Sequence, residues 1–367
     1  MPTYPHLGKL AFATMRIEMI KKILLLSACF ILLCSCNQHS VSHDFEVDGI
    51  YYKIVDEDSR LAMVTYKGRD WNAYDNEYRG AIVIPNIVTY RNHDYSITEI
   101  GDYAFRDCSE MTSIAVPESV WHIGREAFSG CEALKEIHIN NLSAWCEMSF
   151  YDVLDDAGDS PFHYADGLYL NGKLITDLVV PEDVTEIGAH AFEGYEKLRS
   201  VVLHDGIDAI YKSAFFNCCN LTDIELSKNI YYIGAYAFDW TPWYENKPDG
   251  EVYARNHFYK YKGEMPVNTS IVIKEGTETI CESAFDGCEG LSRITIPSSM
   301  RCIHDYAFCG CNNLKEIYCK GHTPPYLNNF YSDYHNDVVL YVPKGAKETY
   351  RCSDHMGYFN NVVETDF

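Results

Sequence analysis

Short apolar pairs separated by one residue recur along this chain and predict a series of strands. Ile114 and Val116 flank Ala115, and Ile294 and Ile296 flank Thr295. This alternation, rich in β-branched residues, is typical of a strand with one buried face. Ten such pairs each predict one short strand. They start at Ile82, Ile114, Ile137, Leu178, Val201, Ile224, Ile271, Ile294, Ile317 and Leu340.

An Ala-Phe pair follows these strands at a regular spacing. Four of the six successive gaps between the pairs are 23 residues long. One such unit cannot bury its apolar face, whereas stacked units share a continuous core. The sequence therefore predicts a repeat solenoid. The pairs start at Ala104, Ala127, Ala191, Ala214, Ala237, Ala284 and Ala307.

Two further segments complete the repeated phrase. V-x-x-I-G predicts a second extended piece, whose glycine is interpreted as permitting a backbone turn. A-F-x-x-C predicts one tight helical or 3-10 turn. Some units depart from the phrase: Cys281 and His304 stand in the glycine position, and Tyr195 and Thr241 stand in the cysteine position. The cysteine is therefore dispensable.

The full phrase, L-x-x-I-x-I-P-x-x-V-x-x-I-G-x-x-A-F-x-x-C, resembles the BspA-like leucine-rich repeats of bacterial surface proteins. The resemblance covers about residues 80–350. It implies a right-handed leucine-rich-repeat solenoid of 23-residue units, in which parallel strands alternate with short helical or 3-10 turns. It also implies a cell-surface protein that binds other macromolecules, with adhesion to host or neighbouring-cell proteins as the expected role.

Two insertions and two ends interrupt or flank the repeats. The inserts, at about 141–176 and 239–268, both contain an Asp-Gly pair beside aromatic residues, which predicts two β-hairpins. Residues 45–79 predict a small β cap, and residues 351–367 predict a second cap. A solenoid needs such caps because its open ends expose apolar core and unpaired strand edges.

The N-terminal 36 residues resemble a bacterial lipoprotein signal. A basic start and an apolar run too short to span a bilayer precede L-C-S-C, which predicts lipidation at Cys36, with Cys29 as the alternative. Residues 1–18 are interpreted as an over-long start, and residues 37–44 as a polar tether. The expected location is an exported protein, held at the outer membrane or cell surface by a lipid anchor.

Charge and motifs argue against two classes of function. With 53 acidic against 30 basic residues, the formal net charge of −23 disfavours nucleic-acid binding. The sequence contains none of the H-E-x-x-H, G-x-S-x-G or phosphate-binding glycine motifs. We therefore predict no catalytic activity and no cofactor, while a hydrolase with a site hidden in the inserts is the less favoured alternative.

The cysteines and one acidic loop were considered as metal sites. The densest sulfur cluster is compatible with buried thiols, a disulfide or a metal site. We predict reduced thiols in the repeat positions because stacked equivalents point in parallel. The acidic insert 152–160 lacks the spacing of a calcium loop and predicts a solvated segment. The cluster comprises Cys281, Cys288, Cys302, His304, Cys309, Cys311 and Cys319.

Two surfaces are candidates for a partner. The first is the outward face of the I-x-I strands, where side chains between the buried positions meet solvent. The second is aromatic, formed by Trp243 and Tyr244 of the second insert, and predicts glycan binding instead of protein binding. The strand-face candidates are Glu136, His138, Asp223, Glu225, Arg293, Glu316 and Tyr318.

Overall fold

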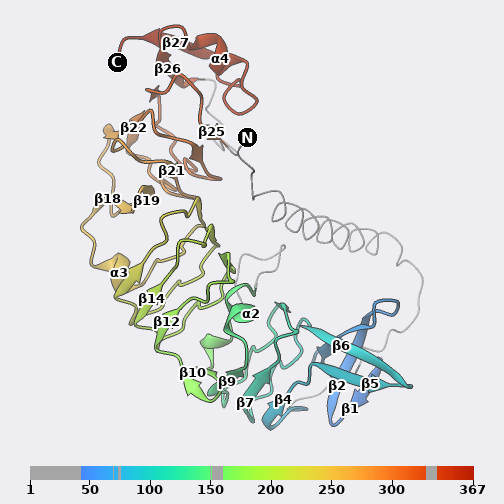
Figure 1. Cartoon of the computed structure of the whole chain (residues 1–367). Helices are drawn as coiled ribbons and strands as arrows, with labels where there is room; N and C mark the ends of the chain where they lie inside the picture. Colours follow the sequence, from blue (N-terminus) through green and yellow to red (C-terminus); the bar gives the residue numbers. More distant parts are fainter. Residues whose placement is uncertain (1–42, 69, 73–75, 149, 151–159, 328–336) are drawn as a thin grey trace, which may run out of the picture. The chain divides into compact units, whose positions relative to one another are not determined.

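Strands and turns make up most of the described chain (Figure 1). The computed structural model describes residues 43–68, 70–72, 76–148, 150, 160–327 and 337–367, all within the compact unit Ser42–Phe367. None of the helices in these ranges is long and apolar enough to cross a membrane. The described helices are α2 (Leu142–Cys146), η1 (Pro161–His163), α3 (Pro242–Glu245) and α4 (Lys347–Arg351).

A first ladder of strands contains all ten predicted I-x-I pairs. Equivalent residues pair in parallel, with Ile114 beside Ile137 and Val201 beside Ile224. The solenoid fold with a 23-residue period is thereby confirmed. The strands are β4 (Gly80–Val83), β7 (Met111–Val116), β9 (Glu136–Ile139), β10 (Gly167–Leu170), β11 (Lys173–Leu174), β12 (Asp177–Val179), β14 (Ser200–Val202), β16 (Asp223–Glu225), β20 (Thr269–Val272), β22 (Leu291–Ile296), β24 (Glu316–Cys319), β26 (Val339–Pro343) and β27 (Asn361–Thr365).

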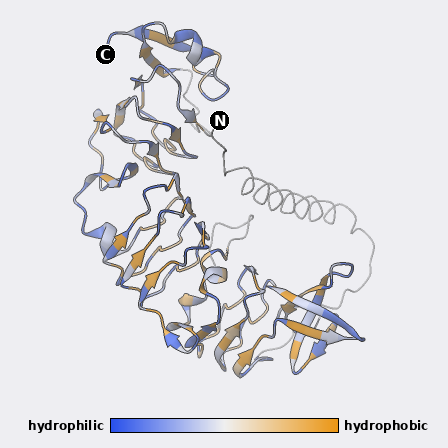
Figure 2. Cartoon of the chain, viewed as in Figure 1, coloured by the Kyte–Doolittle hydropathy of each residue, from blue (hydrophilic) through white to orange (hydrophobic). Residues whose placement is uncertain are grey.

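These strands form three sheets, in the orders β11-β10-β9-β7-β4, β12-β14-β16 and β20-β22-β24-β26-β27. Hydrophobic residues recur in the strands from one coil to the next (Figure 2). The buried positions are those of the predicted pairs, as in β9, where Ile137 and Ile139 are buried while Glu136 and His138 remain partly exposed.

A second ladder contains the V-x-x-I-G strands together with the N-terminal cap. Its sheets run β1-β2-β3-β6-β5 with β8 beside β6, then β13-β15-β17, then β18-β19-β21-β23-β25. The ladder is therefore interrupted twice, between β8 and β13 and between β17 and β19. The strands are β1 (Phe45–Val47), β2 (Ile50–Asp56), β3 (Leu61–Thr65), β5 (Ile87–Tyr90), β6 (His93–Ile100), β8 (His122–Ile123), β13 (Glu186–Ile187), β15 (Ala209–Ile210), β17 (Tyr232–Ile233), β18 (Gly250–Ala254), β19 (His257–Lys262), β21 (Thr279–Ile280), β23 (Cys302–Ile303) and β25 (Tyr326–Leu327).

The A-F-x-x-C segments form a third set of contacts between coils. Their turns close through bonds between residues three apart, as the sequence predicts, and their amides also bond to the next coil: Phe192 N–H donates to the Ala214 carbonyl at 2.9 Å. Phe192 stacks on Phe215 at 5.5 Å, and Phe215 on Phe238 at 6.0 Å. Burying one such ring stabilises the fold by ~1.5–3 kcal/mol.

The repeat glycine has a different role from the one that the sequence suggested. Gly124 and Gly234 have no left-handed backbone, so a turn conformation does not explain them. A Cβ atom added at Gly234 would lie 2.5 Å from the Lys212 backbone nitrogen. The interpretation as a turn glycine was wrong, and the residue type is required by the close approach of the preceding coil's backbone.

Both inserts contain the predicted hairpins, but their turns lie elsewhere. The first hairpin, β10–β11, turns at Asn171 and Gly172, which have φ values of 49° and 80°. The second, β18–β19, turns at Arg255, with a φ of 55°. The prediction that the Asp-Gly pairs form the turns was wrong, because the glycine of each pair is the first residue of a strand.

The inserted hairpins are also part of the solenoid. Strand β10 pairs in parallel with β9, placing Leu168 beside Ile137, and β19 pairs in parallel with β21. Phe258 of β19 stacks on Phe285 at 4.5 Å and so extends the phenylalanine column. At the ends, β1, β2 and β3 form the antiparallel N-terminal cap, while β27 extends the first ladder beyond β26.

Candidate binding surfaces

The seven strand-face candidates lie on three different sheets of the first ladder. Glu136 and His138 belong to β9, where the His138 Nε2 atom lies 2.9 Å from a Glu136 carboxylate oxygen. The His138 ring also stacks on Tyr169 at 5.1 Å. Asp223 and Glu225 are exposed on β16. These two pairs are therefore separate local clusters.

The remaining three candidates are brought together on neighbouring strands. The Arg293 Nε of β22 donates to the Glu316 carboxylate of β24 at 2.5 Å. The Arg293 guanidinium carbon lies 5.4 Å from the centre of the Tyr318 ring. Tyr318 in turn stacks on Tyr341 of β26 at 4.3 Å, nearly parallel. Arg293, Glu316 and Tyr318 thus form one contiguous polar and aromatic cluster.

Register divides this last sheet into two outward rows. In one row, Arg293 pairs with Glu316; in the other, Thr295 pairs with Tyr318 and Tyr318 with Tyr341. The second row ends on exposed valines, Val272 at 58% and Val363 at 43%. An apolar and aromatic stripe therefore runs beside a charged one. The residues of the stripe occupy the same position of their strands in the sequence. Only the strand register shows that they lie side by side.

The structure buries part of the alternative aromatic surface formed by Trp243 and Tyr244. Tyr244 is buried, with 5% of its surface exposed, and cannot present its ring to a ligand. Trp243 is partly buried, packs against Phe238 at 5.1 Å and has Lys247 over its ring at 4.8 Å. The expectation that these two residues form a binding surface is corrected for Tyr244, because its ring packs in the core.

The repeat cysteines connect successive coils. Three of the five thiols donate to the phenylalanine carbonyl of the preceding coil, at 3.0 Å from Cys131 to Phe105, 3.0 Å from Cys218 to Phe192 and 3.1 Å from Cys311 to Phe285. All twelve cysteines among the described residues are free thiols. Burial raises the pKa of Cys108 to about 12, so it stays protonated.

Substitutes at the cysteine position also donate to backbone carbonyls, although Thr241 does so within its own turn. The Tyr195 hydroxyl donates to the Ile175 carbonyl at 2.5 Å and accepts from the Leu168 amide. The Thr241 hydroxyl donates to the Phe238 carbonyl at 2.6 Å. Within the described ranges, no group of three or more His, Cys, Asp or Glu side chains is arranged to hold a metal ion. Cys36 and residues 152–159 of the acidic loop lie outside the described residues.

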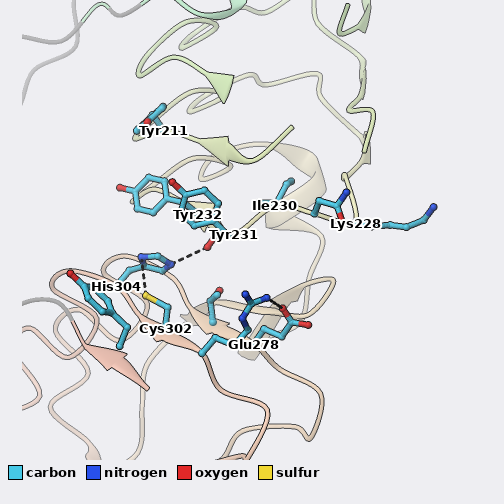
Figure 3. A pocket seen from close by; sticks show the side chains of 12 residues that line it. Tyr211, Lys228, Ile230, Tyr231, Tyr232, Glu278, Cys302 and His304 are labelled. Atoms are coloured by element: carbon cyan, nitrogen blue, oxygen red, sulfur yellow. Dashed lines mark hydrogen bonds and ion pairs between the residues drawn. The ribbon is translucent and has the colours of Figure 1, made fainter. Parts of the chain in front are cut away.

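A groove of about 770 Å³ lies where the second ladder is interrupted between β17 and β19. Figure 3 shows Tyr211 and Tyr232 on one side, and His304, Cys302 and Glu278 on the other. Sequence reasoning missed it, because its two sides come from units separated by the second insert. The lining residues are Tyr211, Lys228, Asn229, Ile230, Tyr231, Tyr232, Glu278, Thr279, Arg301, Cys302, His304 and Tyr326.

His304 joins the two sides of this groove. It occupies the glycine position of its coil, and its Nε2 lies 3.1 Å from the Tyr231 carbonyl oxygen. Its ring also meets the Tyr232 ring edge-on at 5.0 Å. From the same side as His304, Glu282 accepts the Tyr232 hydroxyl at 2.6 Å. These contacts fix the two sides of the groove relative to each other.

Burial disfavours the charged forms of both the thiol and the imidazole in the groove. The Cys302 sulfur lies 3.6 Å from His304 Nδ1. Burial raises the pKa of Cys302 to about 11, and burial lowers the pKa of His304 below its usual value. A catalytic pair requires a reactive thiolate, which this setting disfavours. The arrangement is suited to binding and not to nucleophilic attack.

Comparison with known families decides the identity of the repeat. The profile described as BspA type Leucine rich repeat region matches in six copies, over residues 86–154, 166–247 and 256–347, more than half of the chain. The chain belongs to the BspA-type leucine-rich-repeat family. The BspA-like leucine-rich-repeat proteins are bacterial cell-surface proteins. A comparison with curated proteins gives no match.

Solved structures with similarity to this chain include three bacterial repeat proteins. A leucine-rich cell surface protein from Faecalibacterium prausnitzii is 19% identical, with 90% of this chain and 96% of that chain covered and a TM-score of 0.38. A leucine-rich repeat protein from Bacteroides ovatus is 20% identical, with 88% and 100% covered and a TM-score of 0.30. The pneumococcal vaccine antigen PcpA is 16% identical, with 90% and 100% covered and a TM-score of 0.33.

Proposed function

We propose that this protein binds another macromolecule at the bacterial cell surface, without catalysis, through the outward face of β20-β22-β24-β26-β27. The observation that carries the proposal is the stacked pair Tyr318 and Tyr341, flanked by exposed valines and by the Arg293–Glu316 ion pair. Tyrosine and arginine are enriched at protein interfaces, and large exposed apolar groups often mark them. The partner is a protein of a host or neighbouring cell.

The proposal predicts that the tyrosine pair dominates binding. Replacing both Tyr318 and Tyr341 by alanine removes the ring stack from an exposed face, with little loss of core. We expect attachment of the purified protein to cultured host cells, or to cells of neighbouring bacteria, to fall at least tenfold. Surface-immobilised protein and counted cells provide the measurement, and matched thermal unfolding curves show that the variant is folded.

Two other strand-face pairs serve as matched controls. Glu136→Ala with His138→Ala changes β9, and Asp223→Ala with Glu225→Ala changes β16. If either pair abolishes attachment while the tyrosine variant retains it, the site is on another sheet of the ladder. If all three variants attach as well as the unaltered protein, the strand face is not the binding surface.

The lipid anchor is a separate part of the proposal. Cys36 follows a basic start and a short apolar run, which support its modification at the signal end. Cys36→Ser is expected to move the protein from the membrane fraction to the soluble exported fraction, and Cys29→Ser to leave it in the membrane. The reverse result would assign the anchor to Cys29, and no change in either variant would rule out lipidation at both.

A further inference from the structure

We propose that the groove at the interrupted second ladder binds a short oligosaccharide without net charge. The proposal is independent of the strand-face function, because the groove is lined by residues around β17, β21, β23 and β25. Its volume of about 770 Å³ falls within the ~300–1,000 Å³ typical of ligand sites.

Two exposed tyrosines line the groove. Tyr231 has 59% of its surface exposed and Tyr326 has 47%, although both line the groove. Tyrosine combines a flat apolar face with a polar hydroxyl at its tip. A sugar ring has the matching chemistry, since its C–H groups form an apolar face and its hydroxyl groups lie around the edge. The two tyrosines come from different units, one before and one after the second insert.

The polar lining residues suit hydroxyl groups. Asn229 offers both a donor and an acceptor, Glu278 offers acceptors and Arg301 offers several donors in a fixed plane. Ile230 is the only aliphatic residue among those that line the groove in the described chain, and it is buried. An apolar peptide would instead need a mainly aliphatic lining. The lining therefore favours a polyhydroxylated ligand.

Charge pairing explains why a neutral ligand fits best. The Arg301 Nη1 atom lies 3.3 Å from a Glu278 carboxylate oxygen. The Lys228 Nζ atom lies 2.9 Å from an Asp205 carboxylate oxygen. Both cations in the lining are thus balanced by adjacent carboxylates. An acidic sugar would have to displace one of these carboxylates, whereas a neutral sugar can hydrogen-bond to the pairs as they stand.

The repeat itself offers a matched control. Tyr231 precedes the strand residues of Tyr232-Ile233-Gly234, and Trp121 holds the same position before His122-Ile123-Gly124. Trp121 is also exposed, at 49%, but lies outside the groove. Tyr231→Ala and Trp121→Ala therefore remove a comparable exposed ring from equivalent positions, one inside the groove and one outside it.

The test is an array of neutral oligosaccharides (cello-, chito-, manno- and galacto-), with sialylated and uronic-acid oligosaccharides and proline-rich peptides on the same surface. We expect a neutral oligosaccharide to bind, with affinity reduced at least tenfold by Tyr231→Ala and by Tyr326→Ala. Trp121→Ala should not change it, and Tyr231→Phe, which keeps the ring, should retain most of it. Titration calorimetry with the best oligosaccharide gives the affinities, and thermal unfolding shows that each variant is folded.

Several outcomes would overturn the proposal. These are the absence of binding to every neutral oligosaccharide, binding confined to acidic sugars or to peptides, and neutral-sugar binding that Tyr231→Ala and Tyr326→Ala both leave unchanged. An equal loss in Trp121→Ala would also overturn it, since it would indicate a ring effect outside the groove. None of these results alters the strand-face proposal, which is tested by Tyr318 and Tyr341.

Discussion

The His304 Nε2 atom lies 3.1 Å from the carbonyl oxygen of Tyr231, although the two residues are 73 positions apart in the chain. This contact crosses the interruption of the second ladder between β17 and β19. It exists because His304 replaces the small glycine of the repeat with a side chain long enough to reach the preceding segment. A departure from the repeat consensus is thus a specific structural link.

We predict that His304→Ala weakens the fold. The substitution removes the hydrogen bond to Tyr231 and the edge-on contact with the Tyr232 ring, and it leaves a space beside the groove. The expected loss in unfolding free energy is ~1–3 kcal/mol, measured by urea denaturation. The exposed His93→Ala serves as the control and should change stability by less than ~0.5 kcal/mol. Equal effects would show that the link adds no stability.

Much of the fold could be predicted from local alternation. The ten I-x-I strands were found because a half-buried strand leaves its pattern within three residues, as at Ile137 and Ile139. The antiparallel hairpin turns were misplaced, because Asp-Gly is a general turn signal and the competing Asn171-Gly172 pair formed the turn. The role of the repeat glycine could not be predicted either, since it depends on the close approach of another coil's backbone.

The candidate sites were harder to predict because they depend on contacts between distant units. The contact between Arg293 and Glu316 follows from the 23-residue period, and their slot could be assigned from sequence. Burial of Tyr244 depends on how the second insert folds back onto the solenoid, which its sequence pattern does not define. Predicting the groove requires knowing where the second ladder is interrupted, and no local sequence motif indicates that position.

Stability should decrease in mild acid because of a second buried histidine. His257 is almost fully buried, its Nδ1 atom lies 2.7 Å from the Thr279 hydroxyl oxygen, and burial lowers the pKa of His257 to about 4. The unfolded chain therefore binds a proton below about pH 6.5, while the folded chain stays neutral down to about pH 4. The stabilisation is complete above pH 6.5 and is lost as pH falls toward 4.

The expected loss over that interval is up to ~3 kcal/mol for His257 alone. Urea unfolding at pH 7.0, 5.5 and 4.5 measures it for the unaltered protein and for His257→Gln, which has no titrating group at this position. The difference in unfolding free energy between the two proteins should shrink as pH falls. A difference that stays constant with pH would exclude His257 as the source of the acid sensitivity.

Gly234→Ala is predicted to be destabilising despite its small size. The added carbon would lie 2.5 Å from the Lys212 nitrogen and 2.8 Å from the Tyr211 carbonyl carbon, both backbone atoms of the preceding coil. The coils must separate locally, at a cost of ~1–3 kcal/mol in unfolding free energy. Gly206→Ala is the matched control, because its new carbon would meet only side-chain atoms of His204 and no backbone atom of another coil. A similar stability for both variants would contradict the close-approach explanation.

The repeat thiols are predicted to be reduced and unreactive in the folded protein. Cys131 and Cys218 are fully buried and donate to phenylalanine carbonyls, and burial raises their pKa values, so little thiolate forms at pH 8. Cys219 and Cys352 are exposed and should react with iodoacetamide first. In denaturant without reductant, intact-mass analysis should then show alkylation of the repeat cysteines as well. If Cys108 and Cys131 stayed unmodified in the unfolded chain, a disulfide would be present and the thiol–carbonyl bonds could not be the native arrangement.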